Sequence, residues 1–407
     1  MIGALALVMV AFYGALLSIS VFLKPLLEEF GCTRAMVSGA MSTATGIAGL
    51  FSIVTGRLTD KYGARLLIGL GAFLGGLGYL LMSQVSSLWQ LYLYFGVIVG
   101  MSMTSCWVPI NATVCQRFVE KRVLALGITT SGVNIGQMLL PPLVAYFITG
   151  HGWRPGYFIL AIVVWIAVIP AMMLLGGKPP QSTGELDSRK SKTDKLEDKV
   201  AVQPREGGIT EAAKTVPFWM LTVTSFVTAA GFYFIAVHIV AHATDVGIAA
   251  TLAALVMTFM GGGNIIGKLL VQPIATRIGS RFTILLLFAL QALCLFLLMG
   301  TTSLLMFLIL GAAFGFGSGG TTPIRTSMIV EFFGSRSVGT MMGVIEIAWA
   351  IGTILGPILA GYVFDLTRSY DKAFLAGGFL MATGVVATFF LKAPRQSRTS
   401  YSQPAKC

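Results

Sequence analysis

The sequence predicts an all-α membrane protein with twelve transmembrane helices in two pseudo-symmetric bundles of six. Its 407 residues are 56% hydrophobic and only 11% charged, and the mean hydropathy of +0.84 exceeds that of an ordinary soluble domain. Apolar runs of about 20 residues, the length that a helix needs to cross the hydrocarbon core, recur along the whole chain. A long polar segment divides these runs into six and six.

Short polar or glycine-containing turns separate the predicted spans. Backbone N–H and C=O groups within lipid must find partners inside their own segment, so each run is expected to be a helix. The predicted spans are residues 2–23, 35–57, 64–83, 88–115, 123–149 and 157–176, followed by 216–241, 248–272, 282–300, 304–331, 339–363 and 372–391.

The polar segment marks the predicted domain boundary. An amino-terminal bundle (1–176) is joined by a cytoplasmic linker (177–215) to a carboxy-terminal bundle (216–391), and a cytoplasmic tail (392–407) follows. Two spans, 123–149 and 339–363, carry small residues and a proline at matching intervals, which is typical of closely packed helices in repeated units. The matching positions are Gly127, Gly136 and Pro141 in the first half and Gly343, Gly352 and Pro357 in the second.

A charged segment with two glycines, residues 56–65, joins the second and third spans. Gly56 and Gly63 are expected to permit a tight turn, while Lys61 and Arg65 stay with water and anionic headgroups and Asp60 is a lone acid among bases. This pattern resembles the loop between helices 2 and 3 of the major facilitator superfamily. In that family the acid caps a neighbouring helix and links the two halves. Residues 272–281 are a weaker copy of the segment, with Thr276 in the place of the acid.

The net charge of +12 does not indicate nucleic-acid binding, because the bases cluster in alternate loops instead of on one face. This distribution predicts a multi-pass protein of the cell membrane, surrounded by the lipid bilayer, with both termini in the cytoplasm. The sequence has no phosphate-binding G-x-x-x-x-G-K-[ST] loop, C-x-x-C pair or catalytic Ser/His/Asp set. We therefore expect no cofactor, no metal and no enzymatic activity.

Several further segments resemble the monocarboxylate transporters and the oxalate/formate antiporters within this superfamily. They are residues 21–34, 117–143, 152–154 and 238–247, and the similarity extends over nearly the whole chain. The resemblance implies an organic carboxylate substrate, alternating access and a monomeric carrier.

Three charged residues lie inside apolar spans, where charge is costly and usually faces a cavity or a partner. Lys268 is the first candidate for a substrate anchor, because a buried base can replace the water around a carboxylate; its alternative is a lysine that snorkels to the membrane surface. Arg325 and Glu346 are expected either to form an ion pair or to contact substrate and proton directly. By this resemblance, the position of Asn264 holds an acid or an asparagine in the relatives, and the position of Lys268 holds an arginine. A lysine lacks the two-pronged geometry of arginine.

Four more residues are weaker candidates for the substrate pocket. Trp107 and Gln137 are each interpreted either as pocket residues or as packing and interhelical hydrogen bonding. Tyr13 and Tyr233 could each donate a hydroxyl to a carboxylate. Glu346 is the leading candidate for proton coupling, since Asn264 cannot titrate, and His238 is a second candidate or a hydrogen-bonded residue at a helix end.

These observations predict proton symport of a small monocarboxylate such as lactate or pyruvate, because one strong base favours a monoanion. Two alternatives remain open. The first is anion exchange of the oxalate/formate type, and the second, from another class, is a membrane sensor that transports nothing.

Overall fold

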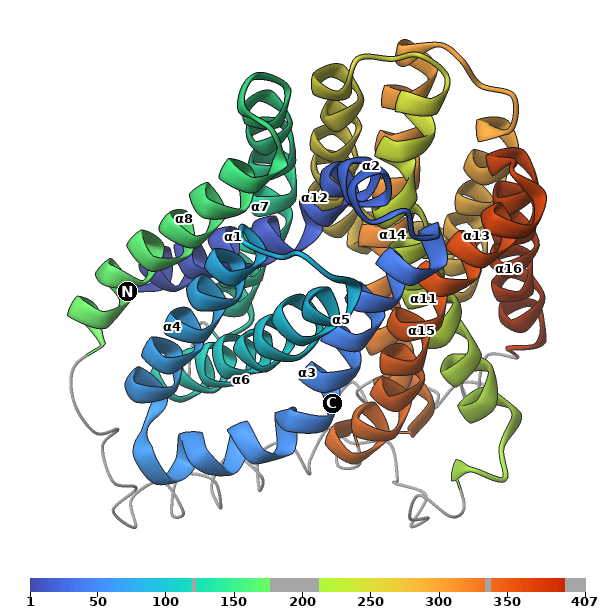
Figure 1. Cartoon of the computed structure of the whole chain (residues 1–407). Coiled ribbons are helices and arrows are strands. Elements are labelled where there is room, and N and C mark those ends of the chain that lie inside the picture. Colours follow the sequence, from blue (N-terminus) through green and yellow to red (C-terminus); the bar gives the residue numbers. More distant parts are fainter. Residues whose placement is uncertain (119–121, 176–211, 334–337, 392–407) are drawn as a thin grey trace, which may run out of the picture.

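The computed structural model describes residues 1–118, 122–175, 212–333 and 338–391, and the regular structure of this part of the chain is helical (Figure 1). Twelve of its segments are long and apolar enough to cross a membrane, which confirms the predicted fold class. The predicted linker and tail lie largely outside the described residues.

The first six spans are built from α1 (Ile2–Leu17) with α2 (Ile19–Phe30), α3 (Arg34–Tyr62), α4 (Ala64–Met82), α5 (Leu88–Leu91) with the π-helix η1 (Tyr92–Val99) and α6 (Gly100–Arg117), α7 (Arg122–His151) and α8 (Trp153–Leu174). The second six are α11 (Val216–Asp245), α12 (Ala250–Ile278), α13 (Ser280–Leu298), α14 (Leu304–Phe333), α15 (Val338–Thr367) and α16 (Tyr370–Phe390).

Five of the twelve spans end four to seven residues beyond their predicted ends. The first span was expected to end at residue 23, but α2 carries it to Phe30 with Pro25 inside the helix. Hydropathy marks only the lipid-covered part of a helix, whereas the backbone hydrogen bonds continue as long as the side chains permit them.

The segment at residues 56–65 is mostly helical, which corrects the expectation of a turn framed by two glycines. Gly56, Arg57 and Lys61 belong to the last turns of α3, because this stretch contains good helix formers and no proline. Only Gly63 makes the turn, with φ of 86°. Lys61 and Arg65 are exposed, whereas the side chain of Asp60 is outside the described part of the structure. The expected contact of that acid with a neighbouring helix therefore stays a prediction.

The second half repeats this turn in detail. Gly279 ends α12 with φ 85° and ψ 147°, and Gly63 ends α3 with φ 86° and ψ 155°. Each glycine donates its N–H to the carbonyl four residues earlier, in Thr59 and Ala275. Both turns need a left-handed φ, which favours glycine, so the weak sequence copy at residues 272–281 encodes the same backbone geometry.

Close helix packing is repeated as well. In the first half, α7 packs against α1 so tightly that a Cβ at Gly136 would lie 2.2 Å from the carbonyl oxygen of Val10. In the second half, α15 packs against α11, and a Cβ at Gly352 would lie 2.5 Å from the carbonyl oxygen of Phe226. Gly136 and Gly352, which match in the sequence, thus mark equivalent contacts between the first and fifth spans of each half.

We predict that Gly136→Ala destabilises the folded protein by about 1–3 kcal/mol, because the added methyl forces α1 and α7 apart. The matched control is Gly127→Ala on the same helix, where nothing lies within 4 Å of the added Cβ. Alanine favours helix there by about 1 kcal/mol. Thermal unfolding in detergent would therefore show a lower Tm for the first variant only, and equal effects at both positions would contradict the packing argument.

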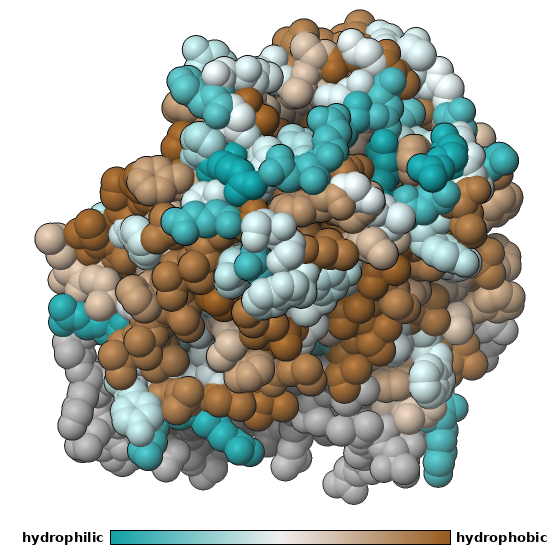
Figure 2. Space-filling model, in the orientation of Figure 1, coloured by the Kyte–Doolittle hydropathy of each residue, from teal (hydrophilic) through white to brown (hydrophobic). Residues whose placement is uncertain are grey.

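The two halves meet mainly along two helix pairs, α3 with α15 and α7 with α12, and α2 also packs against α11. In the first pair Ser42 donates to the carbonyl of Ile354 at 2.6 Å, and in the second Thr258 donates to the carbonyl of Met138 at 2.6 Å. The space-filling view shows a broad hydrophobic belt with hydrophilic side chains gathered above it (Figure 2). Large apolar side chains such as Leu50 and Met173 are 74% and 77% exposed, as expected of residues that face lipid.

Candidate functional site

Lys268 lies within α12, ten residues before the helix ends at Ile278, and its side chain is partly buried. Its Nζ donates a hydrogen bond of 2.7 Å to Oδ1 of Asn134 on α7. Since α7 and α12 belong to different halves, this bond joins them. The ammonium is thus held inside the bundle by a polar partner and does not snorkel past the helix end.

Buried amide groups without partners lie one turn away from this bond. Oδ1 of Asn264 on α12 and both amide atoms of Gln137 on α7 are buried and have no hydrogen-bond partner among the described residues. α7 and α12 run antiparallel, with the Asn134 carbonyl beside Gly261 and the Met138 carbonyl bonded to Thr258, so along the interface Asn264 lies toward Lys268 and Gln137 toward Thr258. Unsatisfied buried amides are uncommon, so the hydrogen-bonding capacity of these groups remains unused in this structure.

Arg325 and Glu346 form the second charged group. Nη2 of Arg325 on α14 lies 3.6 Å from Oε1 of Glu346 on α15, and the Arg325 side chain is only 4% exposed compared with 47% for Glu346. The guanidinium also lies over the ring of Trp349, 5.1 Å from its centroid. Nη1 of Arg325 has no partner among the described residues. The geometry is that of the expected ion pair, and it leaves one donor of the buried guanidinium free for another contact.

The aromatic candidates divide between the halves. Tyr13 on α1 packs edge-on against Trp107 on α6, with ring centroids 5.5 Å apart. Trp107 is 39% exposed, and Tyr233 on α11 is partly buried next to Phe232. Within the described residues no contact joins these rings to Lys268.

His238 occupies a structural position in a hydrogen-bond network. The ring is fully buried; its Nε2 lies 3.1 Å from the Pro357 carbonyl and 3.0 Å from Oγ of Ser38, and its Nδ1 lies 3.2 Å from the Tyr370 hydroxyl. A carbonyl can only accept, so Nε2 carries the hydrogen and Nδ1 accepts from Tyr370. These bonds link α11 with α15, α16 and α3. We therefore assign His238 to the contact between the halves.

Ion pairs at the same end of the bundle reinforce that contact. The carboxylate of Asp245, the last residue of α11, forms ion pairs of 2.6 Å with Lys24 and with Arg34, which both belong to the first half. Arg34 also donates to the hydroxyl of Tyr370 and lies over the ring of Phe364. We call the end of the bundle that contains these residues the Arg34 end.

Asp365, near the end of α15, binds the first residues of α3. Its carboxylate accepts from the backbone N–H groups of Arg34 and Ala35 at 3.0 and 2.9 Å. The first N–H groups of a helix have no partner within the helix and favour a negative charge. One half thus caps a helix of the other half.

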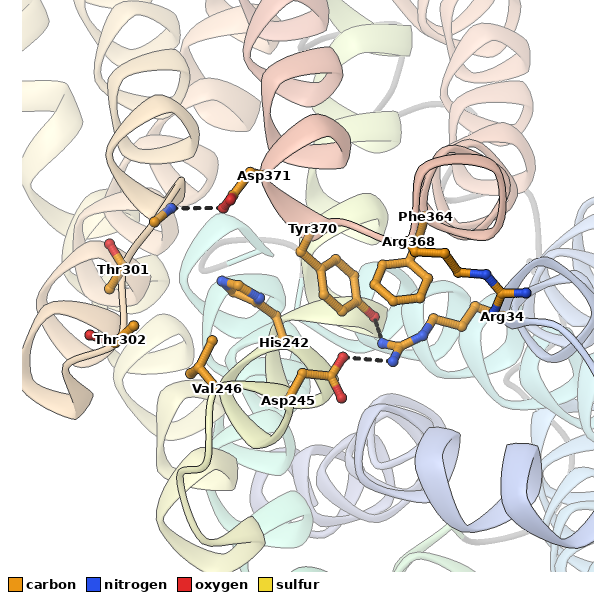
Figure 3. A pocket seen from close by; sticks show the side chains of 11 residues that line it. Arg34, His242, Asp245, Val246, Thr301, Thr302, Phe364, Arg368, Tyr370 and Asp371 are labelled. Carbon is orange, nitrogen blue, oxygen red and sulfur yellow. Dashed lines mark hydrogen bonds and ion pairs between the residues drawn. The ribbon is translucent and has the colours of Figure 1, made fainter.

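A cavity of about 470 Å³ opens beside this network (Figure 3). Figure 3 shows Arg34 pointing from one side to Tyr370 and Asp245, while Asp371 on the other side accepts from the backbone N–H of Gly300. The two acids and the bases Arg34 and Arg368 line the same cavity. The opposite charges of these four side chains balance, so together they give the cavity no net charge.

Asn134, Arg34, Asp245, Asp365 and Tyr370 were not recognised from the sequence. The available signal for the acids was their position, because each ends a predicted apolar span at the side expected to be poor in bases. Asn134 had a weaker signal, a lone amide between Gly132 and Gly136 in an apolar span.

Comparisons with known proteins agree with the fold. The family model described as Major Facilitator Superfamily matches residues 4–242 and 221–406. Monocarboxylate transporter 13 of Rattus norvegicus is 27% identical over 380 residues, covering 92% of this chain and 85% of the relative. Monocarboxylate transporter 12 of Homo sapiens is 29% identical over 376 residues, covering 88% and 72%.

Solved structures with the same fold are more distant in sequence. A bacterial homolog to the human lysosomal transporter Spinster, in an inward-facing and occupied conformation, has a TM-score of 0.74 and 15% identity and covers 95% of both chains. A mutant of the nucleoside transporter NupG has a TM-score of 0.71 and 14% identity, covering 95% of this chain and 98% of that one. At these identities the likeness concerns the fold alone.

Proposed function

Because this chain belongs to the Major Facilitator Superfamily, whose members are multi-pass membrane transporters and not enzymes, we propose that it carries small organic monocarboxylates of the lactate or pyruvate type in symport with a proton. The observation that carries the proposal is the ammonium of Lys268, which is held within the bundle at the contact of the two halves. An anion must exchange its hydration shell for such a group in order to cross.

The arrangement of charges supports a monoanion. Lys268 has only a neutral amide as its described partner, so its charge is available to a carboxylate. Arg325 is already paired with Glu346, so binding a second carboxylate there would require that pair to separate. The names of the curated relatives point to the same substrate class.

Glu346 is the proposed site of proton coupling. It is half-exposed while its partner Arg325 is almost fully buried, so a proton can reach the carboxylate from the solvent side. Protonation would remove the charge that balances Arg325 and would change the stability of this conformation. A proton bound at Glu346 can thereby be linked to the movement of the halves.

The contacts between the halves support alternating access. In the described residues they run from the Arg34 end to the level of Lys268 and Asn134. The distribution of bases in the sequence predicts that the opposite end faces the cytoplasm, with both termini. The proposed transporter is a monomer of the cell membrane, open in this conformation to the cytoplasm.

The test is uptake of radiolabelled lactate, pyruvate, acetate and oxalate into proteoliposomes with an imposed pH difference. We expect accumulation of the monocarboxylates, driven by protons entering on the same side, and little uptake of oxalate. Counterflow that requires an anion inside and ignores pH would instead establish an exchanger of the oxalate/formate type. A protein that moves none of these solutes would support the sensor alternative.

A further inference from the structure

The hydrogen bond between Lys268 and Asn134 has the length that a bond between the ammonium and a substrate carboxylate would have. At 2.7 Å it is as short as the bonds of an ammonium to a carboxylate oxygen. Asn134 is 3% exposed, so its amide is buried at the interface and water does not compete freely for Oδ1. An amide oxygen carries less negative charge than a carboxylate oxygen and is therefore the weaker acceptor.

The neighbouring side chains retain unused hydrogen-bonding capacity. Asn264 Oδ1, one turn before Lys268 on α12, and both amide atoms of Gln137, one turn after Asn134 on α7, are buried without described partners. A ligand that arrives at Lys268 would thus find the unused acceptor of Asn264 one turn away on the same helix. In this structure the ammonium of Lys268 is therefore hydrogen-bonded, whereas the amide oxygen of Asn264 nearby has no partner among the described residues.

We propose that Asn134 is an internal ligand that occupies Lys268 in the empty carrier and gives way to the substrate carboxylate. This inference rests on the proposed function and deepens it. A symporter must return empty after each delivery, and an unpartnered ammonium in the bundle would oppose that step. The Asn134 amide partners the ammonium during the return, whereas an exchanger needs a second anion to do so.

The proposal predicts a change in opposite directions for binding and for net transport. In Asn134→Leu the ammonium has no internal ligand, so a carboxylate no longer has to displace one and should bind at least threefold more tightly. The empty carrier should return at least tenfold more slowly, so net uptake falls while exchange against internal substrate stays within about twofold of the parent. Asn134→Ala should give the same pattern and serves if the leucine variant does not fold.

Thr258→Val is the matched control. Thr258 makes the other hydrogen bond between α12 and α7, to the Met138 carbonyl at 2.6 Å, but it does not touch Lys268. Its loss should affect loaded and empty carriers alike, leaving lactate binding and the ratio of net uptake to exchange unchanged.

The experiment measures lactate binding to the purified protein, and net uptake and counterflow of lactate in proteoliposomes, for the parent and the three variants. Weaker binding in Asn134→Leu with an equal fall of both transport modes would show that Asn134 contacts the substrate directly and would overturn the proposal. Unchanged behaviour in both Asn134 variants would overturn it too. If the parent binds and moves no lactate, pyruvate or acetate, the proposed function fails and the inference with it.

Discussion

Replacing Lys268 with glutamine is expected to lower monocarboxylate uptake at limiting substrate about a hundredfold. Removing one partner from a buried, hydrogen-bonded charge pair costs about 3 kcal/mol, and about 1.4 kcal/mol corresponds to a factor of ten. Glutamine keeps the approximate length of the side chain and can still donate to Asn134, so the contact between the halves that this bond makes is not simply deleted. The measurement is the initial rate of lactate uptake into proteoliposomes.

Two further variants show whether the effect belongs to the charge at this position. Lys268→Arg preserves the charge and adds a two-pronged donor, and it should retain uptake within a few-fold of the parent. Arg277→Gln removes an exposed base in the last turn of the same helix and should leave uptake within twofold. Complete loss in Lys268→Arg, or full activity in Lys268→Gln, would remove Lys268 from the substrate site.

Replacing Glu346 with glutamine is expected to abolish accumulation driven by a pH difference while leaving counterflow within about threefold of the parent. A carrier coupled to one proton accumulates its substrate up to about tenfold for each unit of pH difference, since one unit is worth about 1.4 kcal/mol. Without a group that binds the proton, the substrate only equilibrates. The variant resembles a permanently protonated acid, with the Arg325 charge unbalanced.

A purely structural ion pair would give a different result. If Glu346 only balances the charge of Arg325, the double variant Arg325→Gln/Glu346→Gln should recover both stability and pH-driven accumulation. Coupling through Glu346 predicts that accumulation is not recovered. Glu331→Gln is the control, because this acid is exposed near the end of α14 and should not affect coupling.

The twelve spans and the repeated halves could be predicted because lipid imposes a simple rule on composition and length. Gly63 could be identified as a turn residue for a similarly local reason, since a left-handed φ favours glycine. Gly56 shares its residue type but not its conformation, because the surrounding helix formers extend α3 through it. A glycine permits a turn and does not require one.

Contacts between distant helices were harder to predict. Lys268 could be selected as a buried base, but its partner Asn134 lies in the other half, and nothing in the local sequence specifies which helices meet. The grouping of Arg325 with Glu346 was easier to anticipate, since opposite charges in adjacent spans favour pairing. Arg34, Asp245 and Asp365 lie outside the predicted spans, and sequence position alone does not show that three segments converge at one end of the bundle.

The convergence of charges on Asp245 and Asp365 makes the protein an asymmetric carrier. Separation at the Arg34 end must break the bonds of Lys24 and Arg34 to Asp245 and uncap α3, so these contacts favour molecules that are closed at that end. When only a fraction of the molecules can receive a solute, the apparent affinity falls by that fraction. We therefore expect the half-saturating concentration to be higher for solute arriving at the Arg34 end than for solute arriving from the other compartment.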